Sequence, residues 1–161
     1  MNQWKMYAVW IGLLALSAVG MGGCDQGVTD KDVTNNQISL VDVQKLWAKR
    51  SDMSLLLIDA ELPAVYQAGH IPGSVNMPWT DFSENQKSGD LDPRITAYDN
   101  IIVYGQNRAP GAVQAATKRM LYSGYDVKAF LGGLEEWKAA GLPVDKGPGK
   151  KWSEVPRGQL K

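Results

Sequence analysis

The stretch Ile101-Ile102-Val103-Tyr104-Gly105-Gln106-Asn107-Arg108-Ala109-Pro110-Gly111 decides the fold, because an apolar run passes through a short polar loop toward a helix. Four apolar residues in a row, without polar alternation, predict a central strand that is covered on both faces. Pro110 suits the first position of a helix, so we expect a helix over 110–123. The loop from Gly105 to Ala109 would then face a helix N-terminus, where unpaired N–H groups and the helix dipole favour an anion.

The segments on either side of this stretch repeat the alternation of strand and helix. The apolar run 55–58 predicts a second buried strand, 74–78 a short strand and 127–131 a further one. Helical spacing predicts helices over 40–50 and 63–68 and a short helix that carries Leu134 and Trp137. Residues 79–93 are predicted to form a surface loop with one helical turn. This order predicts an α/β fold, with a parallel central sheet flanked by helices.

Composition limits the classes of function. Lys and Arg together count 17, as do Asp and Glu, so the chain has no net basic charge with which to attract nucleic acid. Cys24 is the single cysteine and His70 the single histidine, which excludes an intramolecular disulfide, a multi-cysteine metal site and a histidine cluster. We therefore expect no metal, no cofactor and no nucleic-acid partner.

The first 23 residues have the composition of a signal peptide, with Lys5 followed by an uncharged run over 6–23. Small residues directly before Cys24 resemble the lipobox of bacterial lipoproteins, which implies cleavage ahead of Cys24 and lipidation of its thiol. Asp25 resembles the signal that retains such proteins in the inner membrane. The alternative is an uncleaved transmembrane anchor, since the run lies at the lower limit of a bilayer span. Both readings place the folded part on the periplasmic side of the cytoplasmic membrane.

Four segments are expected along the chain. Residues 1–23 form the signal peptide, and the polar residues 24–36 form a flexible, lipid-anchored tether. The folded domain covers 37–144. Residues 145–161 form a flexible basic tail, because the sequence there is too polar for a core.

Two separated motifs carry a resemblance to a known family. The segment 59–76 contains Asp59, Tyr66 and the run Gly69-His70-Ile71-Pro72-Gly73, and the segment 127–144 contains a Gly-Gly pair, Trp137 and a Gly-Leu-Pro ending. Together they resemble a single rhodanese-like domain over 37–144. The resemblance implies a three-layer α/β fold and a site at the loop after the strand 101–104.

The chain departs from the catalytic members of that family at two positions. Where they carry the cysteine that takes up sulfane sulfur, this chain has Gly105, and where they carry an arginine near the site, it has Glu61. The resemblance therefore implies a domain without its nucleophile and with a weaker field for anions. The loop residues Gly105, Gln106, Asn107, Arg108 and Ala109 are the candidate ligand site, with Arg108 as the cation that would assist anion binding.

Three functions remain open from the sequence. The first is a non-catalytic binding or interaction module whose partner is a small anion or a protein. The second is a sulfurtransferase or persulfide carrier that uses a thiol supplied by a partner. The third is a phosphatase-like activity, which is also cysteine-dependent in relatives of this fold. We expect His70 to hold a turn and Asp59 to anchor the end of its strand rather than to take part in catalysis.

Overall fold

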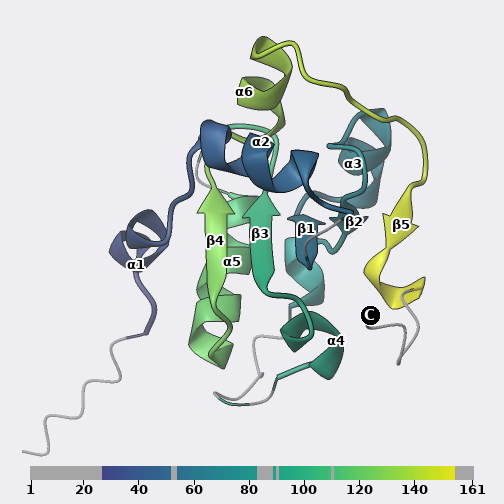
Figure 1. Cartoon of the computed structure of the whole chain (residues 1–161). Helices are drawn as coiled ribbons and strands as arrows, with labels where there is room; N and C mark the ends of the chain where they lie inside the picture. The colour runs from purple at the N-terminus through teal and green to yellow at the C-terminus, as the bar shows by residue number, and fades with distance from the viewer. Residues whose placement is uncertain (1–26, 52–53, 83–88, 90, 110, 155–161) are drawn as a thin grey trace, which may run out of the picture.

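The computed structural model describes residues 27–51, 54–82, 89, 91–109 and 111–154, and Figure 1 labels its elements. The helices are α1 (Asp30–Asn35), α2 (Leu40–Ala48), α3 (Pro63–Ala68), α4 (Pro93–Thr96), α5 (Ala112–Ser123) and α6 (Gly133–Ala139). The strands are β1 (Leu55–Asp59), β2 (Val75–Asn76), β3 (Asn100–Tyr104), β4 (Val127–Phe130) and β5 (Lys150–Lys151). Two 3-10 turns, η1 (Trp79–Asp81) and η2 (Trp152–Glu154), complete the list.

The strands form one parallel sheet in the order β4-β3-β1-β2-β5 (Figure 1). β1 and β3 are neighbours near its centre, and their register pairs Leu55 with Asn100 and Asp59 with Tyr104. Both strands therefore end at the same edge of the sheet. The predicted α/β fold with a parallel central sheet is confirmed.

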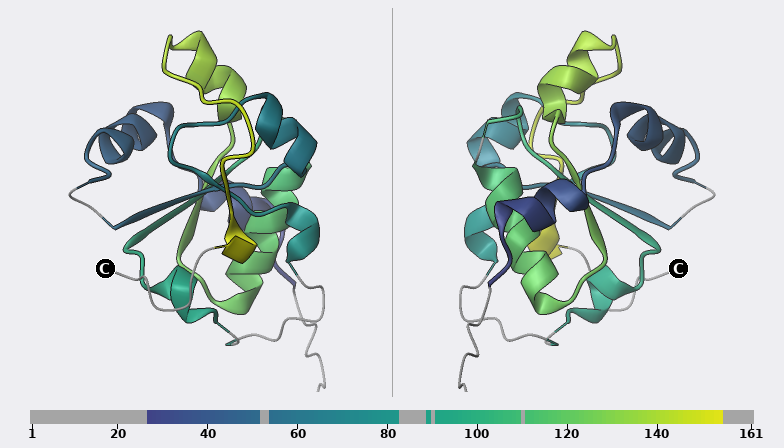
Figure 2. Two further views of the ribbon diagram at one scale, coloured as in Figure 1. Left: turned by 90° about the vertical axis from the view of Figure 1, so that its right-hand side faces the viewer. Right: turned by 90° about the vertical axis from the view of Figure 1, so that its left-hand side faces the viewer.

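Helices cover both faces of the sheet, as Figure 2 shows with α2 on one side and α5 on the other. Alternate residues of the two central strands enter two separate cores. Leu56 and Val103 belong to the core that includes α5, whereas Leu57 and Ile102 belong to the core that includes α2 and α6. This is why the strands read as continuous apolar runs: neither face is open to water.

The expectation of a flexible tether is wrong for residues 30–35, which form α1. Thr29 and Asp32 cap the start of this helix, and its Val33 is 1% exposed in the core beside α5. Asp30 also pairs with Lys118 of α5 at 2.7 Å. Directly after α1, the backbone at Gln37 bridges to β4, so the sheet edge is covered there.

The expectation of a flexible tail is wrong for residues 145–154. Asp145 bridges to His70, and β5 pairs in parallel with β2 as the last strand of the sheet. Directly after β5 in the sequence, the ring of Trp152 lies 4.7 Å from the guanidinium of Arg94. The remaining residues of the predicted tail, 155–161, lie outside the described residues.

The helix predicted from 110 begins later, at Ala112, with Gly111 as its N-cap and without a side-chain cap. Pro110, the predicted first helical residue, lies outside the described residues, as do the predicted signal peptide and Cys24. Within the described ranges, no helix is long and apolar enough to span a bilayer.

Candidate functional site

The candidate site lies where β1 and β3 end side by side. Ala60 donates its backbone N–H to the carbonyl of Tyr104 at 3.0 Å, so the pairing of the two strands extends one residue beyond β1. The residues that follow the two strands are thereby brought together: Glu61 after β1 lies beside Gly105 and Gln106 after β3. The carboxyl edge of a parallel sheet is the usual place for a ligand site in such folds.

The Glu61 carboxylate lies inside the predicted ligand loop. Its Oε1 accepts the backbone N–H of Gln106 at 2.9 Å. A Cβ carried by residue 105 would lie 2.8 Å from the same oxygen, closer than real Cβ atoms approach. Glycine at position 105 therefore leaves the space into which the carboxylate fits.

The backbone of Glu61 is fixed on both sides of the residue. Its N–H donates to Asp59 Oδ1 at 3.0 Å, and its carbonyl accepts from Asn76 Nδ2 at 2.8 Å. Because Asn76 belongs to β2, three neighbouring strands together determine where the half-buried Glu61 side chain starts.

The loop itself is held by the first turn of α6. Leu134 donates its N–H to the carbonyl of Gly105 at 2.9 Å, and Glu135 to that of Gln106 at 2.8 Å. Gly133 permits this approach, because its φ is +61° and a Cβ there would collide with the Gly105 carbonyl. The loop backbone is thus fixed before any ligand binds.

The rim of the loop is acidic. Arg108, the predicted anion-binding cation, pairs with Glu136 at 3.0 Å, and Asn107 donates to Glu135 at 3.3 Å. The N–H of Ala109 is taken by Asn107 Oδ1 at 2.9 Å. Glu61, Glu135 and Glu136 thus each accept a hydrogen bond from this loop, and this excess of carboxylates disfavours a free anion.

Asp59, beneath the loop, is a fully buried carboxyl group. In the described part of the chain its Oδ2 makes no hydrogen bond of ordinary geometry. Burial raises the pKa of Asp59 to about 6, which the Glu61 N–H and the Tyr104 hydroxyl oppose and the Glu61 charge reinforces. As predicted, Asp59 anchors the end of its strand, by accepting the Glu61 N–H, and it does so as a buried carboxyl group with a raised pKa.

His70 has the structural role that was expected of it. The residue is buried, its Nδ1 lies 3.0 Å from the Tyr66 carbonyl, and its ring stacks on that of Tyr66 at 3.8 Å. The Tyr104 hydroxyl accepts the Ile71 N–H at 3.0 Å and lies 2.9 Å from Ser74 Oγ. These contacts fix the turn that follows α3.

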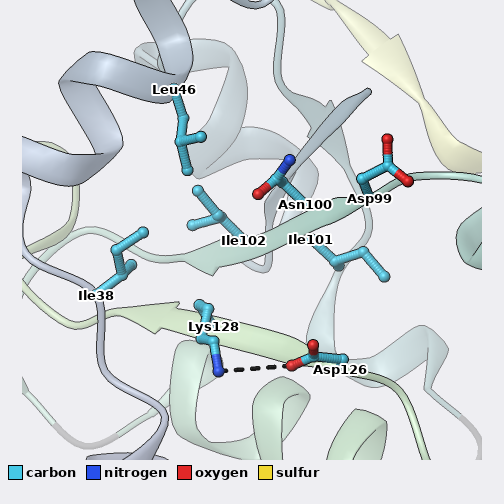
Figure 3. A pocket seen from close by; sticks show the side chains of 8 residues that line it. All are labelled: Ile38, Leu46, Asp99, Asn100, Ile101, Ile102, Asp126 and Lys128. Carbon is cyan, nitrogen blue, oxygen red and sulfur yellow. Dashed lines mark ion pairs between the residues drawn. The ribbon is translucent and has the colours of Figure 1, made fainter. Parts of the chain in front are cut away.

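A cavity of about 200 Å³ lies at the opposite end of the sheet, where β3 and β4 begin (Figure 3). Leu46 and Ile102 contribute apolar side chains to it, and Lys128 pairs with Asp126 at 3.5 Å on its wall. It shares no residue with the loop 105–109. No group of three or more potential metal ligands occurs in the described ranges.

Comparison with known proteins establishes the family. A family model described as "Rhodanese-like domain" matches residues 42–140, and the chain belongs to that family.

Two curated relatives show how much of the chain is shared. The chain is 32% identical over 129 residues to the HTH-type transcriptional regulator Rv0324 of Mycobacterium tuberculosis, which covers 76% of this chain and 52% of the regulator. It is 31% identical over 105 residues to the thiosulfate sulfurtransferase YnjE of Escherichia coli, covering 58% of this chain and 24% of the enzyme. The chain thus spans about half of the first relative and a quarter of the second.

The fold also matches solved structures. The BH2092 protein of Bacillus halodurans superposes with a TM-score of 0.57 at 20% identity, covering 70% of this chain and 78% of that protein. At this identity the likeness shows the shared three-layer fold alone.

The sequence reading found the loop and Glu61 but missed the contributions of Asn76, Glu135 and Glu136. A signal for the two glutamates was present, because they directly follow the Gly132-Gly133 turn. A turn after a parallel strand lies at the same sheet edge as the loop 105–109. The role of Asn76 depends on the strand order, which the sequence pattern does not reveal.

Proposed function

We propose that this chain is a non-catalytic rhodanese-like interaction module, tethered through a lipidated Cys24 to the periplasmic side of the bacterial cytoplasmic membrane. The observation that carries the proposal is the loop after β3, where Gly105 supplies no nucleophile and the Glu61 carboxylate fills the adjacent space. Sulfur transfer in this family proceeds through a thiolate, and the only thiol of the chain is that of Cys24.

The test of inactivity is a thiosulfate:cyanide sulfur-transfer assay on the full chain. We expect turnover at the buffer rate, because no thiolate lies in the loop to accept sulfur. Cys24→Ala is the matched control, which removes the last thiol and should leave that rate unchanged. Turnover above the buffer rate in both proteins would contradict the proposal.

A second candidate is a sulfur carrier that works with a thiol supplied by a partner, favoured by the likeness to a protein named as a thiosulfate sulfurtransferase. The same assay separates the two, since a small dithiol added as acceptor would then raise turnover well above the rate of dithiol and thiosulfate alone. An interaction module gives no such increase.

The membrane tether is tested by the intact mass of protein extracted from membranes. We expect a chain that begins at Cys24 and carries a diacylglyceryl group, because a hydrophobic run and small residues precede this cysteine. Cys24→Ala should lose the lipid mass and retain residues 1–23. An unmodified wild-type chain that still contains residues 1–23 would support the transmembrane anchor instead.

A further inference from the structure

We infer that the Glu61 carboxylate occupies the ligand position of the loop 105–109 and thereby excludes small anions from it. The Gln106 N–H and the open space at Gly105 form a position of the size and polarity that suits one oxygen of a small oxyanion. In this protein the Glu61 carboxylate fills that position, with Oε1 2.9 Å from the Gln106 nitrogen.

The placement of Glu61 is built into the fold and is not a chance orientation of a surface side chain. Hydrogen bonds from Asn76 and to Asp59 fix its backbone, and α6 fixes the carbonyls of Gly105 and Gln106. The backbone on both sides of the Glu61–Gln106 hydrogen bond is therefore fixed before the bond forms, so the entropy lost on forming it is confined to the Glu61 side chain.

Gly105 and Glu61 depend on each other. Any side chain at position 105 would force the carboxylate to move, because its Cβ would lie 2.8 Å from Oε1. A thiol introduced there would also lie next to a carboxylate, which opposes its ionisation. An anion such as sulfate or thiosulfate must displace the Glu61 carboxylate, and it meets Glu135 and Glu136 on the rim.

The test uses the full chain and three variants. Glu61→Gln keeps an oxygen that can accept from Gln106 and removes the charge, whereas Glu61→Ala removes the acceptor. Glu135→Ala is the matched control, since it removes one rim charge without touching the Gln106 N–H. Each protein is titrated with sodium thiosulfate and sodium sulfate at constant ionic strength while its amide chemical shifts are followed.

We expect saturable shifts at Gln106 and Asn107 only in Glu61→Ala, at millimolar anion, and none in the wild type, Glu61→Gln or Glu135→Ala. Equal shifts in Glu61→Gln and Glu61→Ala would mean that charge alone excludes anions, and would overturn occupancy of the site by Glu61. Saturable shifts in the wild type, or none in Glu61→Ala, would overturn the inference as well.

Amide hydrogen exchange gives a second readout without any added ligand. The Gln106 amide should exchange roughly tenfold faster in Glu61→Ala than in the wild type, and Glu61→Gln should keep most of the protection. Unchanged exchange in Glu61→Ala would refute the hydrogen bond. The inference concerns the loop of the proposed function, but this measurement holds whether or not the protein transfers sulfur, so the two can fail separately.

Discussion

Trp137→Ala should lower the free energy of unfolding by about 3–5 kcal/mol, the usual effect of removing a large aromatic side chain from a core. Trp137 is fully buried, and its indole N–H donates to the Pro143 carbonyl at 2.7 Å. Its ring meets that of Trp47 edge to face, with 5.4 Å between the ring centroids. The substitution removes both contacts and leaves a cavity between α6 and α2.

Urea denaturation followed by circular dichroism measures this loss. Trp137→Phe keeps an aromatic ring and loses the hydrogen bond and part of the volume, so it should cost less, about 1–2 kcal/mol. Lys138→Ala, exposed on the same helix, is the control and should change stability by less than about 0.5 kcal/mol. A loss below about 1 kcal/mol in Trp137→Ala would show that α6 does not depend on this anchor.

The second large effect concerns pH and Asp59. Because burial raises its pKa from 3.8 to about 6, ionising Asp59 costs free energy in the folded state that it does not cost in the unfolded state. Below pH 3.8 the group is protonated in both states and the penalty is absent. The penalty grows between pH 3.8 and 6 and is complete above pH 6, where it amounts to roughly 3 kcal/mol.

Asp59→Asn removes this titration and keeps an oxygen that can accept the Glu61 N–H. From pH 4 to pH 8, the unfolding free energy of the wild type should therefore fall by roughly 2–3 kcal/mol relative to that of Asp59→Asn. Chemical denaturation of both proteins across this range measures the difference, in which the other titrating groups cancel. Parallel pH profiles would show that Asp59 titrates alike in the folded and unfolded states.

The parts of the fold that could be predicted from sequence are the elements whose burial shows in the pattern of apolar and polar side chains. The runs 55–58 and 101–104 are buried on both faces, so their lack of polar alternation identifies them as central strands. The helix α2 likewise begins directly after a serine, and Ser39 accepts the N–H of Asp42 at 3.2 Å as its N-cap.

The parts that escaped prediction leave little trace in side-chain patterns. α1 buries the single apolar residue Val33, which is too few to establish a helical period. β5 consists of Lys150 and Lys151, both exposed, and it pairs with β2 through its backbone, so its sequence carries no apolar pattern.

At the site, the charge reversal at Glu61 was visible in the sequence, but its bond to Gln106 was not. The two residues are 45 positions apart and meet only because β1 and β3 are neighbours. The sequence therefore predicted which residues form the site, but not the hydrogen bond that joins them.

The docking of α1 shortens the stretch of chain between Cys24 and the folded domain. A tether over 24–36 would give a leash of roughly 45 Å when extended, whereas the chain from Cys24 to the first residue of α1 reaches roughly 20 Å. In Figure 1 the chain enters α1 from below, away from α6 and the carboxyl ends of the strands. With the proposed lipid on Cys24, so short a link would keep the domain close to the bilayer and would turn the loop 105–109 away from the membrane surface.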